Sequence, residues 1–389
     1  MYKHQTIILT TPFNYCQDLQ DSLSFQTEHV ESRESFGCNT LESKLATFVC
    51  RVKTVPREHR VLLAIIEISE LHLAQDLNKQ SNDSLRRRKE NQDAFCVCDV
   101  LAGDADATLL SVFDGHGPQG AFVSHFVREQ YHQAVAKTYA ALVSPSCWRA
   151  DGHDRHDAMR DIERKGESIE CDIITEVFRQ ASQIVTEILN ASEIDISVSG
   201  TTAVSILVRK TDLFIANIGD SRAVVAKFSD EQQCYRLHCE TKDHKPDVPE
   251  ECTRIKMHNG RVFDWGSCRV WLQDVDMPGL AMSRSFGDSV AKTVGVIAEP
   301  DVFIVETVEF GSTDRDQEEQ RPLAFAVLAS DGIWEFMTTE ECIHFLGECI
   351  INTGMSPQDA CTALIEEACK RWDSEEDVID DITAVVVYF

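Results

Sequence analysis

The sequence predicts an α+β fold in which helices cover antiparallel sheets. Short runs of β-branched and other apolar residues recur along the chain, as in buried strands. Only residues 209–212 separate Val208 from Leu213, and only residues 219–221 separate Ile218 from Arg222. Links this short cannot hold a crossover helix, so the strands they join must pair antiparallel. Helical patterns stand in separate blocks, which is typical of layered α+β proteins.

The patterned part of the chain divides into strands and helices as follows. The predicted strands are 94–100, 108–113, 202–208, 212–218, 222–227, 235–239, 302–308, 323–329 and 383–389. The predicted helices are 118–143, 170–189, 338–350 and 356–372. The last two helices begin with the capping sequences ThrThrGluGlu and SerProGlnAsp, in which a hydroxyl or carboxylate can accept from the first backbone N–H groups.

Residues 1–83 differ from the rest by their polar, weakly patterned sequence. We predict an N-terminal extension over 1–83, partly disordered or packed on the core, and one large domain over 84–389. Within the extension, the pattern of 57–77 fits either a helix or a first strand. The polar stretch 144–166 is predicted as a surface insertion, and 311–322 as a charged loop inside a hairpin.

Composition excludes several classes of partner. The 389 residues are 43% hydrophobic, which is enough for a large buried core. Their formal net charge of -28 disfavours nucleic acid or an anionic membrane as the main partner. The most apolar stretch, 61–74, contains acidic residues and is too short to span a bilayer. The 15 cysteines include no CxxC pair, and no secretory h-region opens the chain. We therefore expect a reduced, cytoplasmic and/or nuclear protein, monomeric and without a membrane partner.

Aspartates stand at the ends of several apolar runs. Asp114, Asp220 and Asp331 each lie beside a glycine at the end of such a run, and Asp380 precedes the last strand. A carboxylate at the end of a buried strand is costly unless it is paired or binds a cation. Several of them together suggest one site with oxygen ligands for a hard divalent cation, Mg²⁺ or Mn²⁺.

Two further residue types fit chemistry on a phosphate ester. His116 follows Asp114 in a glycine-bracketed turn, where it is either a surface histidine or a proton donor beside a metal-bound substrate. Arg88 lies in a basic run just before Asp93 and a strand. Such a run is either a solvated patch or localisation signal, or a clamp for phosphate oxygens.

Eight segments in order resemble the metal-dependent PP2C (PPM) protein serine/threonine phosphatases. They are AsnGlnAsp (91–93), PheAspGlyHisGlyPro (113–118), SerGlyThrThrAla (199–203), AlaAsnIleGlyAspSerArgAla (216–223), LysAspHisLysPro (242–246), SerArgSerPheGlyAsp (283–288), AlaSerAspGlyIleTrpGlu (329–335) and AspAspIleThr (380–383). The resemblance covers residues 84–389. It implies a PP2C-like four-layer α-β-β-α sandwich with two central antiparallel sheets and a variable flap over about 245–279.

The resemblance also implies roles for individual residues. Two Mn²⁺ or Mg²⁺ ions would share Asp114 and the Gly115 carbonyl, with Asp331 and Asp380 on one ion and Asp93 on the side of the other. Asp220 matches the ligand of a third, weaker ion. Arg88 matches the phosphate-binding arginine, and His116 matches the proposed general acid. The implied reaction is hydrolysis of phosphoserine and phosphothreonine in phosphoprotein substrates by a metal-activated water.

One position departs from the pattern of animal members, which commonly carry glutamate where this chain has Gln92. A neutral amide oxygen there would weaken cation binding at the second metal or shift ligation to Asp93 and water. Gln92 is also the one feature that favours the alternative function, a catalytically weak PP2C-like fold acting as a binding or scaffold module. A metal-dependent phosphodiesterase or nuclease is a further alternative, disfavoured by the net charge.

Two other clusters have spacings that could suit a metal. Residues 151–157 read AspGlyHisAspArgHisAsp, but they lie in a polar insertion and fit a solvated loop better. Cys234, His238, Cys239 and His244 could suggest zinc. Neighbouring residues of a strand point to opposite faces, however, so the strand predicted over 235–239 disfavours that site.

Overall fold

The computed structural model describes residues 7–9, 46–54, 60–68, 91–143, 169–209, 212–264, 266–306, 321–376 and 378–389. The first three ranges are strands described by their backbone alone. The predicted insertion 144–166 lies outside the described residues.

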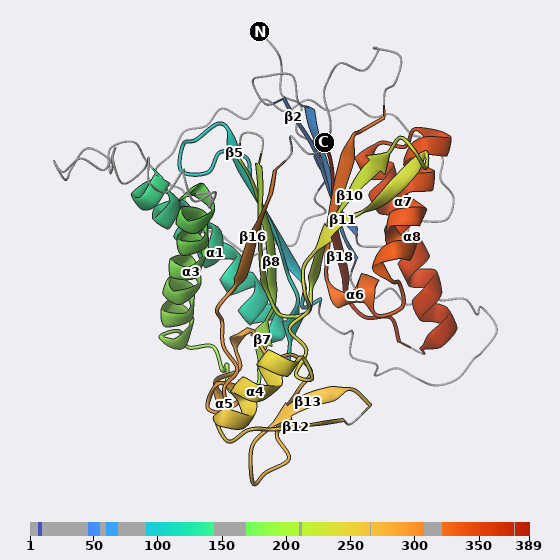
Figure 1. Ribbon diagram of the computed structural model, residues 1–389. Helices are drawn as coiled ribbons and strands as arrows, with labels where there is room; N and C mark the ends of the chain where they lie inside the picture. The colour runs from blue at the N-terminus through green and yellow to red at the C-terminus, as the bar shows by residue number, and fades with distance from the viewer. Residues whose placement is uncertain are drawn as a thin grey trace, which may run out of the picture.

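Two antiparallel sheets stand face to face in the middle of the molecule (Figure 1). The five-stranded sheet has the order β16 (Asp301–Glu306), β9 (Asp212–Ile218), β8 (Ala203–Arg209), β5 (Ala107–Phe113) and β4 (Ala94–Cys98). The seven-stranded sheet has the order β1 (Ile7–Leu9), β2 (Ala46–Thr54), β3 (Arg60–Ile68), β18 (Ile382–Tyr388), β17 (Ala324–Ala329), β10 (Arg222–Ser229) and β11 (Cys234–Glu240).

Strand alternation divides the buried side chains into layers. In β5, Leu110 and Val112 point into the cluster between the sheets, whereas Leu109 and Phe113 join the cluster beneath the helices on the other face. Because successive strand residues face opposite ways, a strand buried on both faces must be apolar throughout. This explains why β5, β8 and β17 appear in the sequence as unbroken apolar runs.

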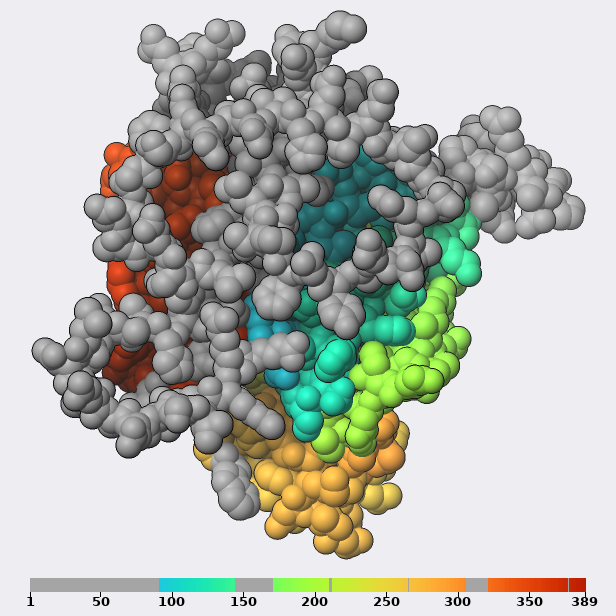
Figure 2. All heavy atoms as spheres, turned by 180° about the vertical axis from the view of Figure 1, so that it is seen from behind, coloured from blue at the N-terminus to red at the C-terminus, as the bar shows by residue number. Residues whose placement is uncertain are grey.

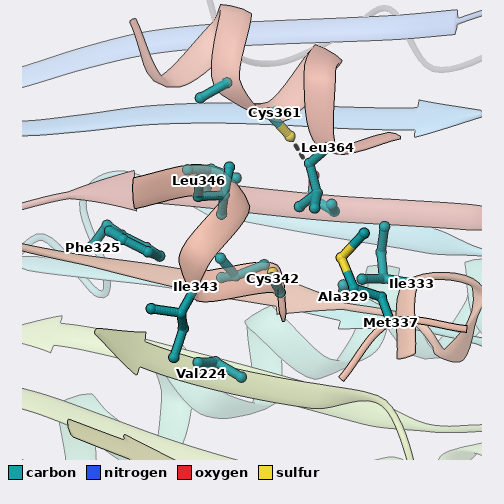
Figure 3. Close-up of a cluster of buried hydrophobic side chains, with 14 of the residues drawn as sticks. Val224, Phe325, Ala329, Ile333, Met337, Cys342, Ile343, Leu346, Cys361 and Leu364 are labelled. Carbon is teal, nitrogen blue, oxygen red and sulfur yellow. Dashed lines mark hydrogen bonds between the residues drawn. The ribbon is translucent and has the colours of Figure 1, made fainter. Parts of the chain in front are cut away.

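Helices cover the outer face of each sheet. The five-stranded sheet carries α1 (Gly120–Val143) and α3 (Ile169–Asn190), and the seven-stranded sheet carries α7 (Thr339–Thr353) and α8 (Pro357–Glu375) (Figure 1). Figure 3 shows Leu346 of α7 and Leu364 of α8 pointing toward the sheet that contains Phe325. The predicted four-layer α-β-β-α sandwich is therefore confirmed, and all nine predicted strands and four predicted helices are present with small shifts at their ends.

A lobe projects from one end of the sandwich (Figures 1 and 2). It contains α4 (Pro249–Met257), α5 (Ser289–Lys292) and a three-stranded sheet of β12 (Arg261–Asp264), β13 (Cys268–Trp271) and β14 (Pro278–Leu280). Between the lobe and the sandwich lies a second small sheet, in which β7 (Gly200–Thr201) sits between β6 (Gly115–His116) and β15 (Phe286–Gly287).

Two expectations are resolved by the strand pairing. The ambiguous stretch 57–77 contains strand β3, which pairs in continuous register with β18 from Leu62 opposite Tyr388 to Ile68 opposite Ile382. The N-terminal extension thus contributes strands to the seven-stranded sheet, while its boundary at residue 83 stays a prediction. The hairpin predicted around 311–322 is wrong, because β16 and β17 belong to different sheets.

None of the helices in the described part of the chain is long and apolar enough to cross a membrane.

Candidate active site

Five aspartates from distant parts of the chain meet at the end of the sandwich beside the lobe. Asp93 precedes β4, Asp114 follows β5, and Asp220 lies between β9 and β10. Asp331 begins the short helix α6 (Asp331–Trp334) directly after β17 and Ser330, and Asp380 lies just before β18. Burial raises the pKa of Asp114 well above its ordinary value, and the charges of the other four aspartates raise it further. The structure therefore brings these predicted residues into one cluster.

The cluster includes one acid that the sequence analysis did not single out. Burial raises the pKa of Asp93, and the charge of Asp381 is the next largest cause. The Oδ2 atom of Asp381 accepts a hydrogen bond from the backbone N–H of Gln92 at 2.9 Å. Its only signal in the sequence is the doubled aspartate at 380–381, which does not say which of the two points inward.

Short hydrogen bonds from two threonines fix the backbone of Asp114. The Asp114 N–H donates to Thr202 Oγ1 at 3.0 Å. The Asp114 carbonyl accepts from Thr201 Oγ1 and from the Thr202 N–H, both at 2.9 Å. Gly115 then packs so closely that a Cβ there would lie 2.4 Å from the Gln92 carbonyl oxygen. Only glycine fits this approach, so the turn that carries Asp114 is held without using its carboxylate.

Lys245 is a described cation inside the cluster. Its Nζ donates to Asp220 Oδ2 at 2.5 Å. Burial alone would lower the pKa of Lys245, but the charge of Asp220 outweighs this effect and raises it. One ammonium cannot offset five or six carboxylates, so repulsion between like charges persists within the cluster.

The donor atoms suit a hard divalent cation. Asp93 Oδ1 and Asp220 Oδ1 are buried with no hydrogen-bond partner, and a buried carboxylate oxygen left in this way is strongly unfavourable. Carboxylate oxygens are the ligands that Mg²⁺ and Mn²⁺ prefer. Among the described residues, no three acidic, histidine or cysteine side chains are gathered closely enough to form a finished ion cage. Mutual repulsion keeps like charges apart, and bound cations would offset it.

His116 borders the cluster. Its Nε2 lies 2.7 Å from Asp288 Oδ2, and Asp288 is buried. Burial lowers the pKa of His116, but the charges of Asp288, Asp220 and Asp331 outweigh burial and raise it above its ordinary value. The ring is therefore close enough to the acid cluster to be affected by the charges of Asp220 and Asp331 as well as by Asp288. A proton donor to a phosphate ester bound at this cluster would have to lie as close.

The family model described as protein phosphatase 2C matches residues 79–376. The chain belongs to the protein phosphatase 2C family.

Individual relatives support this assignment. The chain is 34% identical over 311 residues to "Probable protein phosphatase 2C 64" of Oryza sativa subsp. japonica, a match covering 78% of this chain but only 63% of that protein. It is 31% identical over 323 residues to "Probable protein phosphatase 2C 35" of Arabidopsis thaliana, covering 77% of this chain and 78% of that protein. The fold is similar to that of serine-threonine phosphatase 2C from Toxoplasma gondii, with a TM-score of 0.63 at 21% identity over 88% of this chain and 99% of that one.

The structure places most of the predicted site residues of this phosphatase 2C chain, but not all of them. Asp93, Asp114, Gly115, His116, Asp220, Asp331 and Asp380 all lie at the acid cluster, and their roles as ligands or proton donor stay predictions. Arg88 lies outside the described residues, so its predicted role in binding phosphate is untouched by the structure.

Gln92 forms a hydrogen bond within the turn that carries His116. Its side-chain Nε2 donates to the Gly117 carbonyl at 2.8 Å, bracing the turn that carries His116. A glutamate at this position could not donate this bond. Gln92 is therefore a fitted part of the turn, whatever its effect on the second metal.

The zinc alternative gains no support from the structure. Cys234, His238 and Cys239 lie on β11, and within the described ranges they join no group of three or more metal-binding side chains. His244 is engaged elsewhere: its Nδ1 accepts from the Gly219 N–H at 3.0 Å, so its Nε2 carries the proton and donates to Asp301 at 3.1 Å. The cluster 151–157 lies outside the described residues.

The acid cluster predicts an unusual dependence of stability on pH in the metal-free protein. The folded-state pKa values of Asp93 and Asp114 are raised, and that of Asp331 is raised to about 7 by burial and by Asp220 and Asp380. Groups with raised pKa values bind protons more tightly when folded, so their contribution to stability is complete at low pH and falls as pH rises toward the folded pKa. We expect the melting temperature in EDTA to fall between about pH 4, near the unfolded pKa, and about pH 7, the folded pKa of Asp331.

Thermal unfolding in EDTA and in excess Mg²⁺ checks this expectation. Bound cations should flatten the profile by stabilising the ionised carboxylates. A melting temperature in EDTA that rises over the same interval would contradict the clustering of these acids.

Proposed function

We propose that the protein hydrolyses phosphoserine and phosphothreonine in proteins, using two Mn²⁺ or Mg²⁺ ions. The observation that carries this proposal is the convergence of five aspartates, two of them buried (Asp93 and Asp220) and three half-buried, from four strand ends and one helix start, with a histidine at its border. A pair of divalent cations, when bound, supplies a water acidic enough to attack phosphorus at neutral pH. No cysteine nucleophile is needed for such a reaction.

The chain's own residues would divide the remaining work. Asp114 and the Gly115 carbonyl would hold both ions, Asp331 and Asp380 one of them, and Asp93 the other. Asp220, already bonded to Lys245, would hold a third and weaker ion in competition with that ammonium. His116 would protonate the departing serine or threonine oxygen, and Arg88 would bind the phosphate oxygens.

A phosphatase assay decides between this function and its alternatives. We expect hydrolysis of a phosphoserine peptide in Mn²⁺, complete loss in EDTA, and recovery when Mn²⁺ is restored. Circular dichroism in EDTA is the control that the protein stays folded. Absence of turnover at every Mn²⁺ concentration, with the fold intact, would favour the scaffold alternative, whereas cleavage of single-stranded DNA in preference to the phosphopeptide would favour a nuclease.

A further inference from the structure

His116 and Asp288 are brought together by the small sheet between the sandwich and the lobe. His116 pairs with Gly200 on one side of β7, and Gly287 pairs with Gly200 on the other. A Cβ on Gly200 would lie 2.1 Å from Asp288 Oδ2 and 2.5 Å from the Phe286 carbonyl oxygen. The Asp288 carboxylate therefore crosses directly over Gly200 to reach the His116 ring, and only the missing side chain at Gly200 leaves room for it.

Asp288 is held in an unusual conformation. It has φ 49° and ψ 49°, in the left-handed region that non-glycine residues seldom adopt. Its backbone N–H donates to the Ser199 carbonyl at 2.9 Å, and its Oδ2 accepts from Ser285 Oγ at 2.6 Å. Backbone strain of this kind persists where the surroundings fix a side chain, and it gathers at functional sites. The surroundings of Asp288 hold its Oδ2 atom within hydrogen-bond distance of His116 Nε2.

This contact determines how the imidazole is used. An ionised carboxylate only accepts hydrogen bonds, so the 2.7 Å contact places a proton on His116 Nε2. The other ring nitrogen, Nδ1, is buried and has no hydrogen-bond partner. Nδ1 is therefore the ring nitrogen whose hydrogen-bonding capacity is not used by the protein.

We propose that Asp288 is a positioning residue for catalysis: it holds the proton of His116 on Nε2 and directs Nδ1 to the oxygen of the departing serine or threonine. The inference rests on the proposed function and goes beyond it, because it names the atom that donates. As the oxygen of the attacking water bonds to phosphorus and the water gives up one proton to solvent, the ester bond breaks and the Nδ1 proton moves to the serine oxygen. The ring is left neutral with its Nε2 proton in place, and one proton returns to Nδ1 once the products have left and the site is open to solvent.

The first test compares leaving groups. We expect Asp288→Asn to slow hydrolysis of a phosphoserine peptide by about 10- to 100-fold. p-Nitrophenyl phosphate, whose leaving group needs no proton, should slow by less than about 3-fold. The double variant His116→Ala/Asp288→Asn should be no slower than His116→Ala within about 2-fold, because the two residues act as one unit.

A matched control exists in the same molecule. His244 and Asp301 form a second histidine–aspartate pair at 3.1 Å, away from the small sheet. Asp301→Asn should show no difference between the two substrates. Equal losses on both substrates for Asp288→Asn, or losses that multiply in the double variant, would overturn the positioning role and leave Asp288 a structural residue.

A measurement independent of turnover completes the test. Nitrogen NMR of histidine-labelled, metal-free wild-type protein, followed to a pH at which the ring is neutral, should show the remaining proton of His116 on Nε2. A proton on Nδ1 alone would overturn the inference even if the enzyme is active. If the wild-type protein has no phosphatase activity, the proposed function fails, and the NMR spectrum still decides whether Asp288 fixes the ring.

Discussion

Asp114→Asn is expected to lower the turnover of a phosphopeptide by about 10³-fold or more while leaving the fold intact. Asp114 is the residue whose pKa is raised by four other aspartates, which makes it the centre of the cluster. Removal of a charge that would hold both cations forfeits several kcal/mol of metal-dependent stabilisation, and each 1.36 kcal/mol is a factor of about ten in rate. The fold should survive because Thr201 and Thr202 bind the backbone of Asp114 rather than its carboxylate.

The same substitution should stabilise the metal-free protein. At a pH where Asp114 is ionised, loss of this like charge relieves repulsion by on the order of 1 kcal/mol, so the melting temperature in EDTA should rise there. Turnover in Mn²⁺ and thermal unfolding in EDTA measure the two effects separately. Asp373→Asn, a change of an exposed carboxylate on α8, is the control and should alter neither. Retention of wild-type activity by Asp114→Asn would show that the assignment of the metal site is wrong.

The second large effect concerns stability rather than chemistry. Glu251 of α4 is buried, and its carboxylate accepts from Arg254 Nη1 at 2.7 Å, from Arg254 Nη2 at 2.6 Å and from Arg284 Nη2 at 2.9 Å. Ser283 Oγ donates to it as well. Burial by itself would raise the pKa of Glu251, but the hydrogen bonds from Arg254 and Arg284 lower it far below its ordinary value. This carboxylate joins α4 of the lobe to the segment that leads from β14 to β15 of the small sheet.

Glu251→Ala should therefore destabilise the protein by about 3 kcal/mol, because it leaves two partly buried guanidinium groups without their partner. The melting temperature should fall by roughly 4 to 5 °C. A depressed folded pKa contributes stability above the unfolded pKa and loses it as pH falls, so the gap between variant and wild type should narrow below about pH 4.

The neighbouring residue provides the control. Glu250 pairs with Lys242 at 3.3 Å, and both side chains are exposed. Glu250→Ala should change the melting temperature little, since exposed ion pairs contribute little to stability. Equal effects at the two positions would mean that the Glu251 cluster does not hold the lobe in place.

Local pattern was enough to predict helices covering antiparallel sheets, whereas the four-layer arrangement of two sheets was expected only from the family resemblance. Strands such as β5 and β17 are apolar on both faces because each lies between a sheet and a helix layer, and this leaves a plain signal in the sequence. Residues 57–77 gave no such answer. Their assignment as strand β3 depends on pairing with β18, more than three hundred residues away, and hydrophobic periodicity carries no information about that partner.

The site shows the same division. The aspartates at strand ends could be predicted because each stands in the sequence at the end of an apolar run, where a carboxylate is costly unless it is paired or binds a cation. The partners Asp288 for His116 and Lys245 for Asp220 were not visible, since they lie 172 and 25 residues from the groups they contact. The start of α4 was overlooked although Pro249, Glu250 and Glu251 form a sound helix start.

Gly200 has a consequence for how related proteins can be compared with this enzyme. Any side chain there would collide with the Asp288 carboxylate and with the Phe286 carbonyl. The collision would separate the His116 ring from Asp288 without altering any of the aspartates predicted to hold metal ions. We expect a related protein that keeps all these aspartates but lacks this glycine to bind ions and phosphoproteins, and to cleave the phosphoserine ester slowly. The residue at position 200 would therefore indicate whether a relative can catalyse the reaction, although Gly200 is neither a predicted metal ligand nor the predicted proton donor.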